Sequence, residues 1–164
     1  MNKNDFLSSI CGFTEEAVQD LLLPVSVQTA DDTESRRAAK VYKMRLPDSK
    51  AAAKKVPYII HSVITASDSQ PEGEKTSSSV QLRSVFAVYC EDEQEGALML
   101  LELIDRYRIP LLRTRVLNKR YVLDLTEPMD AMIYTDDTAP YFMGEMVSRW
   151  YGPSVEREVS EWLQ

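Results

Sequence analysis

The sequence is poor in the residues from which common active sites are built. Its 164 residues include one histidine, two cysteines and five glycines. It has no Gly-rich phosphate-binding loop, no Cys-x-x-Cys pair, no Gly-x-Ser-x-Gly turn and no His-Glu-x-x-His helix. We therefore predict no catalytic residue, no cofactor and no metal ion, and expect that the chain is not an enzyme.

Two features resemble sites, and each has a simpler explanation. His61 lies in a predicted strand with no second metal ligand at a recognisable spacing, so we interpret it as structural. Glu91, Asp92, Glu93 and Glu95 could indicate a cation site, but acidic residues are also typical of a helix start, and the spacing of a calcium loop is missing. Acid–base pairs formed by folding stay open, because sequence does not show proximity in space.

Positive charge and long apolar runs are also scarce. The 26 acidic residues outnumber 19 basic ones, for a net charge of −7. This excess repels phosphate backbones, so we expect no direct nucleic-acid binding. No apolar run reaches the roughly 20 residues that span a bilayer, and no polybasic anchor is present, so we expect no membrane association.

The chain also starts without a basic segment followed by an apolar one, so we predict no secretion signal and a cytoplasmic location. In that compartment Cys11 and Cys90 stay reduced, although a disulfide bond between them is the alternative. Cys90 ends an apolar strand pattern and is expected in the core.

We predict an N-terminal helical arm and linker over residues 1–40. Phe6, Leu7 and Ile10 share one helical face, and Gly12 divides the arm into one or two helices. The arm packs either on its own domain or on a neighbouring subunit. The polar residues 25–40 form a linker or, from residue 34, a surface helix.

We predict an α+β domain over residues 41–164. Alternating apolar residues indicate strands, and apolar residues at helical spacing indicate a long helix from 91 to about 113, which Pro110 kinks or restarts. We expect a mainly antiparallel sheet of about four to five strands in ββαββ order, with the long helix on one face and a short C-terminal helix from 154. The predicted strands cover residues 41–46, 57–65, 80–90, 119–126 and 141–151.

Residues 66–79 contain no large apolar side chain, and we predict a mobile loop there. This loop is either an inert connection or a segment that becomes ordered on a partner. Aromatic and arginine residues near the C-terminus are a second candidate interface, with core packing as the alternative. The candidate interface residues are therefore Asp68, Gln70, Glu72, Glu74, Lys75, Arg149, Trp150 and Tyr151.

Several segments resemble those of small neck or tail proteins from prophages of Gram-positive bacteria. The overall plan of residues 41–155 is similar to that of bacteriophage tail-terminator (tail-completion) proteins. The segments that carry this resemblance are Arg45-Leu46-Pro47-Asp48, Val56-Pro57-Tyr58-Ile59-Ile60, Val85-Phe86-Ala87-Val88-Tyr89 with the acidic helix start and Gly96, and Ala139-Pro140-Tyr141-Phe142-Met143-Gly144.

The resemblance implies a ring, usually of six subunits, that caps the head-proximal end of the tail tube and ends its polymerisation. The implied partners are further copies of the chain, the tail tube protein and the head-tail connector, first in the host cytoplasm and then in the virion neck. The family has no catalytic residues, and the loop over 66–79 would contact the tube or a neighbouring subunit. The alternatives are another neck or minor tail adaptor protein, or a small α+β enzyme or ligand-binding domain.

Overall fold

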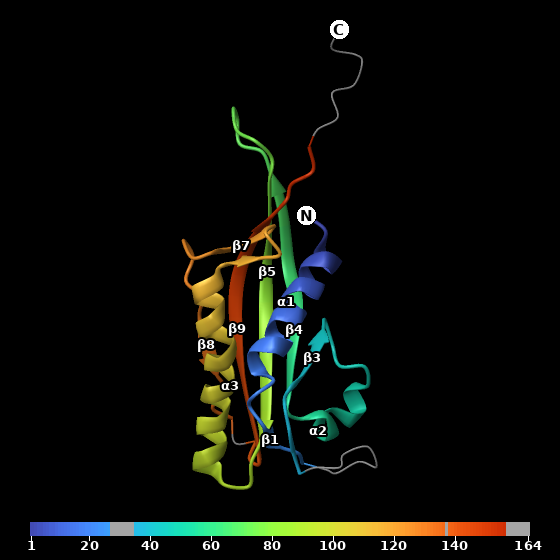
Figure 1. The fold of residues 1–164 in the computed structure, drawn as a ribbon, viewed down its shortest axis with the longest axis vertical. Helices are drawn as coiled ribbons and strands as arrows, with labels where there is room; N and C mark the ends of the chain where they lie inside the picture. Colours follow the sequence, from blue (N-terminus) through green and yellow to red (C-terminus); the bar gives the residue numbers. More distant parts are fainter. Residues whose placement is uncertain (27–34, 137, 157–164) are drawn as a thin grey trace.

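A computed structural model describes residues 1–26, 35–136 and 138–156. Its helices are α1 (Lys3–Val18), α2 (Ala52–Lys55) and α3 (Glu93–Thr114), with a 3₁₀ turn η1 at Ser49–Ala51. Its strands are β1 (Leu23–Pro24), β2 (Arg36–Arg37), β3 (Lys40–Lys43), β4 (Tyr58–Ser69), β5 (Ser77–Tyr89), β6 (Val116–Leu117), β7 (Tyr121–Asp124), β8 (Ala131–Ile133) and β9 (Tyr141–Gly152). Figure 1 shows α1 and α3 lying on the same side of one large sheet.

The sheet differs from the one that the sequence predicted. It is a curled mixed sheet of seven strands in the order β3-β4-β5-β9-β7-β6, with β8 beside β9, and β1 and β2 form a separate pair. The chain is α+β, but the prediction of a mainly antiparallel sheet of four to five strands in ββαββ order is wrong. Strands as short as β6 and β8 show no alternation in the sequence. The parallel pairing of β3 with β4 depends on the crossover through α2, which the sequence shows only as a connector.

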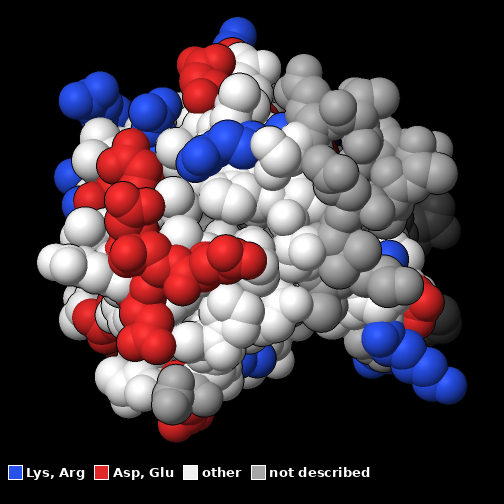
Figure 2. Space-filling model, turned by 90° about the horizontal axis from the view of Figure 1, so that it is seen from below, with Lys and Arg blue, Asp and Glu red and all other residues white. Residues whose placement is uncertain are grey.

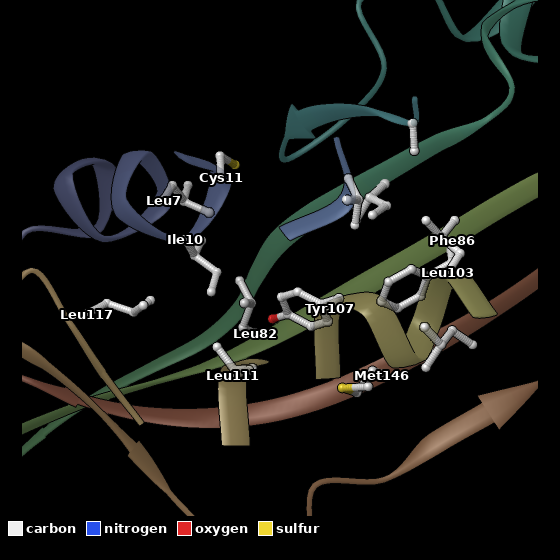
Figure 3. Packing of buried hydrophobic residues seen from close by; sticks show 14 of the residues in the cluster. Leu7, Ile10, Cys11, Leu82, Phe86, Leu103, Tyr107, Leu111, Leu117 and Met146 are labelled. Carbon is white, nitrogen blue, oxygen red and sulfur yellow. The ribbon is translucent and has the colours of Figure 1, made fainter. Parts of the chain in front are cut away.

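Side chains of the long strands β5 and β9 point alternately to the two faces of the sheet. On the face towards the helices, Leu82, Phe86 and Trp150 are completely buried. We call this the inner face; Figure 3 shows Leu82, Phe86, Met146 and Tyr107 of α3 among the side chains that fill it. Residues that alternate with them, such as Arg83 and Glu145, lie on the opposite, outer face. The prediction that residues 80–90 form a central strand is confirmed.

Helix α1 forms part of the core, so of the two alternatives for the N-terminal arm the structure shows packing on the chain's own domain. The arm is one helix that continues through Gly12, and the side chain of Asn2 caps it by accepting a hydrogen bond from the Asp5 amide (3.1 Å). The ring of Phe6 packs 5.3 Å from that of Tyr121 and 5.5 Å from that of Trp150. These contacts join the helix to β7 and β9.

Helix α3, from Glu93 to Thr114, lies close to the predicted range of 91 to about 113. The Asp92 side chain accepts a hydrogen bond from the Glu95 amide (2.9 Å), which caps the first turn. The helix continues through Pro110, so of the two predicted alternatives, a kink or a restart, the restart does not occur. Tyr107 and Leu111 are buried on either side of the proline, and their packing keeps both halves on the sheet. The helix ends at Arg115, which has a left-handed backbone (φ 57°).

Three predicted elements need correction or lie outside the described residues. Residues 66–69 and 77–79 are paired strand and not loop, because β4 and β5 continue to the Ser69–Ser77 pair. The surface helix predicted from residue 34 is wrong, because residues 36–37 form β2 and residue 40 begins β3. Most of the predicted C-terminal helix falls on residues 157–164, which lie outside the described part of the chain.

Candidate functional site

The outer face of the sheet is not covered by α1 or α3, which pack on the inner face. Strand register aligns its side chains in rows across the sheet. At the end of the sheet that is lowest in Figure 1, one row consists of Tyr58, Ala87 and Met143. At the upper end, beside the β4–β5 hairpin, another row consists of Thr65, Gln81 and Arg149. The surface therefore changes from apolar at one end to polar at the other.

The lower end of the outer face is aromatic. The rings of Tyr42 and Tyr58 lie 6.4 Å apart, and those of Tyr89 and Tyr141 lie 5.5 Å apart. Residues before β4 cover part of this area, and a hollow of about 220 Å³ remains between them and the sheet. The hollow is lined by Ala52, Val56, Tyr58, Ala87, Tyr141 and Met143.

The middle of the outer face carries an ion pair. The guanidinium of Arg83 donates a hydrogen bond to the Glu145 carboxylate and another to the Tyr134 hydroxyl (2.9 Å). These hydrogen bonds raise the pKa of Arg83 above its ordinary value. The cluster connects β5, β9 and the residue that follows β8 across this face.

The upper end contains a second charged cluster and an open groove. Asp124 accepts hydrogen bonds from the amide (2.9 Å) and hydroxyl (2.7 Å) of Thr126, which keep the pKa of this carboxyl below its usual value. Its other oxygen lies 3.7 Å from Nε of Arg149, whose guanidinium stacks 5.7 Å from the Tyr151 ring centre. The groove beside them has a volume of about 630 Å³ and is lined by residues that include Thr65, Ser67, Gln81, Glu127, Asp130 and Arg149.

The β4–β5 hairpin extends from this end of the sheet, and its tip lies beyond the rest of the described molecule (Figure 1). Residues 64–69 of β4 are exposed, and residues 65–69 pair only with β5. The exposed tip covers residues 70–76, where Gly73 has a φ of 78° that favours glycine. The side chain of Gln70 donates to the Glu74 carbonyl (3.2 Å), so the turn has a defined geometry.

The structure separates the predicted interface residues into three groups. The hairpin carries five of them, all exposed: Asp68, Gln70, Glu72, Glu74 and Lys75. Arg149 and Tyr151 lie on the outer face. Trp150 points the opposite way and is completely buried, so it packs in the core and does not reach a partner. The alternation of side chains along a strand makes this separation unavoidable.

His61 lies on the inner face, away from the groove. Its Nε2 is 2.8 Å from Oγ1 of Thr14, which donates its own proton to the Ile10 carbonyl (2.7 Å). Its Nδ1 is 2.8 Å from Oγ of Ser84. The hydroxyl–imidazole pair resembles that of a nucleophile and its base, but all three side chains are buried. Burial lowers the pKa of His61 to about 3, so the ring is neutral and joins α1 to β4 and β5.

The acidic cluster and the two cysteines have structural positions in the described part of the chain. The acidic residues from Glu91 to Glu95 cap and precede α3, and no group of three potential metal ligands occurs in residues 1–26, 35–136 and 138–156. Cys11 and Cys90 are free and buried, which confirms the core position of Cys90. In the same part of the chain, no helix is long and apolar enough to cross a membrane.

The sequence did not predict two sets of interactions, the Arg83–Glu145 ion pair and the contacts of Arg37. Arg83 and Glu145 lie on adjacent strands far apart in sequence, and only the register brings them together. Arg37, placed in the linker, donates to the carbonyls of Lys55 (2.6 Å), Val56 (3.0 Å) and Pro57 (2.9 Å) and so holds the start of β4. Neither a protein-family model nor a curated protein matches the chain.

Proposed function

We propose that this chain is a structural protein of a bacteriophage or prophage neck. It caps the head-proximal end of the tail tube, ends tube polymerisation and docks to the head connector. It acts in the host cytoplasm during assembly and then forms part of the virion. The proposal rests on the resemblance carried by residues 41–155 and on the β4–β5 hairpin, which is the single structural observation that supports it most.

The hairpin has the properties expected of a binding arm. Residues 65–69 of β4 pair with β5 alone, so the backbone groups along their other edge are available to a partner. Polar side chains such as Ser67 and Asp68 protect this edge from nonspecific aggregation. A hydrogen bond from Ser78 to the Asp68 carboxylate stabilises the pairing near the tip. The arm is therefore ordered in the chain, and its surface remains exposed.

The core side chains support a structural role as well. The inner face is filled by α1 and α3, and the only histidine is enclosed there with Ser84. The outer face instead carries aromatic and arginine side chains, such as Tyr151 and Arg149, and these residue types are enriched at protein interfaces. A contact between two different surfaces of one chain closes into a ring when the rotation between copies permits it.

The test removes the hairpin tip. Residues 70–76 are replaced by Asn-Gly, a two-residue turn that joins the paired Ser69 and Ser77. We expect thermal unfolding to change little, because the tip is exposed, and tube capping to be lost. The measurement is the length distribution of purified tail tubes, seen by electron microscopy, with and without the chain. The control is Lys50→Ala, an exposed residue of η1 outside the hairpin.

Wild-type chain should bind one end of each tube and stop its growth. Tubes that grow equally long with and without wild-type chain would contradict the proposal. Binding to tubes without an effect on growth would instead favour another neck or minor tail adaptor protein. Unchanged capping by the tip replacement would show that the hairpin is not the contact.

A further inference from the structure

Basic residues gather at one end of this acidic chain. From Arg106 to Leu123 the sequence contains six basic residues and no acidic one, although the net charge of the whole chain is −7. Four of them are exposed at the end of α3 and around the β6–β7 turn, and we call these the basic end: Arg113, Arg115, Lys119 and Arg120. Such a concentration of one charge favours an acidic partner.

Two residues of the basic end, Lys119 and Arg120, border an apolar area on the outer face, and Arg120 also lies 3.9 Å from the Asp5 carboxylate. Register places Val116, Val122 and Tyr151 side by side on three neighbouring strands, and they are 42%, 45% and 36% exposed. A hollow of about 300 Å³ lies beside them, lined by Lys119, Arg120, Val122, Tyr151, Gly152 and Pro153. An apolar floor with a rim of cations fits a partner that combines an apolar side chain with several carboxylates.

At the other end of α3, the chain itself carries a surface that combines apolar side chains with several carboxylates. Its first turn and the residues before it expose four carboxylates, which we call the acidic end: Glu91, Asp92, Glu93 and Glu95. Figure 2, which views the molecule from the lower end of Figure 1, shows acidic side chains concentrated there. Leu98, one turn further on, is 59% exposed, and Leu101 is 47% exposed. The exposed leucines are complementary to the apolar hollow, and the carboxylates beside them are complementary to Lys119 and Arg120.

We propose that copies of this chain associate head to tail, with the acidic end of one copy bound at the basic end of the next. Leu98 of the first copy lies over the hollow, and its carboxylates pair with Lys119 and Arg120 of the second. The two ends lie at opposite ends of α3, a helix of 22 residues and about 33 Å. Because the two surfaces differ, the contact is heterologous and each copy uses both ends.

Electrostatics sets the expected strength of this contact. An exposed ion pair contributes only about 0–1 kcal/mol, so the charges mainly select the partner and the apolar area supplies the burial. The association is therefore weak and depends on concentration, and salt weakens it further by screening. That the contact closes into a ring rests on the proposed function. The contact itself can be tested without tail tubes.

The experiment uses the full chain and two charge-reversed variants. One carries Lys119→Glu and Arg120→Glu, and the other carries Glu93→Lys and Glu95→Lys, leaving the capping Asp92 in place. We measure mass by sedimentation at several concentrations, in low and high salt. Each variant alone should associate at least about tenfold more weakly than wild type. An equal mixture should restore association, since the native acidic end of one variant meets the native basic end of the other, and the two reversed ends also carry opposite charges.

The matched control reverses charge between the two ends. Glu102→Lys with Arg106→Glu exchanges an i, i+4 ion pair and leaves net charge unchanged, so association should stay at the wild-type level. A wild-type chain that stays monomeric in low salt at millimolar concentration overturns the proposal. A mixture that fails to restore association overturns it as well.

A short DNA duplex is the last probe, because phosphate is the other partner that cations attract. Binding of the duplex that is lost with Lys119→Glu and Arg120→Glu, while self-association persists, would show that the basic end serves a polyanion and would overturn the contact. Self-association without tube capping would instead contradict the proposed function and leave the contact standing.

Discussion

The two faces of the sheet are built on the same strands and differ in what covers them. Trp150 on the inner face is completely buried by α1 and its neighbours, whereas Tyr151, the next residue, is 36% exposed on the outer face. The inner face therefore supplies most of the burial that stabilises the fold. The outer face keeps its charged and aromatic groups in contact with solvent, where a partner reaches them.

Polar groups show the same contrast. On the inner face, His61 is enclosed and satisfied by Thr14 and Ser84, as buried polar groups require. On the outer face, Arg83 and Glu145 pair where solvent also reaches the arginine, whose side chain is 44% exposed. We expect the inner cluster to matter for stability and the outer one to matter little.

The largest expected effect separates neighbouring residues of β9. Trp150→Ala removes a completely buried side chain beside Phe6 and should lower the free energy of unfolding by about 3–5 kcal/mol. Tyr151→Ala is the matched control on the other face and should cost less than about 1 kcal/mol. Urea unfolding followed by circular dichroism measures both, since Trp150→Ala removes the buried tryptophan whose fluorescence would report unfolding. Equal losses of unfolding free energy in the two variants would show that Tyr151 is as buried as Trp150, which would contradict the exposure of the outer face.

The next effect is a pH dependence that comes from the inner face. Burial lowers the pKa of His61 from 6.5 to about 3, so the folded chain takes up this proton less readily than the unfolded chain. The stability from this group is complete above pH 6.5 and falls as the pH decreases. At pH 5 the loss is about 2 kcal/mol, and it grows until the pH approaches 3.

His61→Gln removes the titration and keeps a polar side chain between Thr14 and Ser84. Urea unfolding of both proteins at pH 7 and pH 5 gives the result as a difference, which cancels the contribution of the carboxyl groups. The wild-type advantage at pH 7 should shrink by about 2 kcal/mol at pH 5. If wild type and variant lose stability in parallel, His61 is not buried as a neutral group.

The sequence predicted the elements that have strong patterns. The alternation in 80–90 and 141–151 indicated the long strands β5 and β9, and the spacing from Ala97 to Leu111 indicated α3. These patterns exist because one side of each element is buried and the other is not. The lone histidine was also interpreted correctly as structural, since two hydroxyl partners satisfy its buried ring.

The remaining features depend on contacts between distant residues. The parallel β3–β4 pairing is held partly by Arg37, whose guanidinium reaches carbonyls about twenty residues further along the chain. The interface prediction at Trp150 ignored that neighbouring strand residues point to opposite faces. The hollow beside Lys119 combines three strands, so no local window of sequence contains it.

The smallest expected effect concerns the ion pair on the outer face. A double-mutant cycle with Arg83→Ala and Glu145→Ala should give a coupling free energy of about 0.2–1 kcal/mol, because solvent reaches the arginine. The coupling should fall as salt rises, since ions screen an exposed pair more than a buried one. A coupling above about 2 kcal/mol that does not respond to salt would mean that the pair is shielded from water. In that case the two faces would differ less than their exposure indicates, and the outer face would contribute to the stability of the fold.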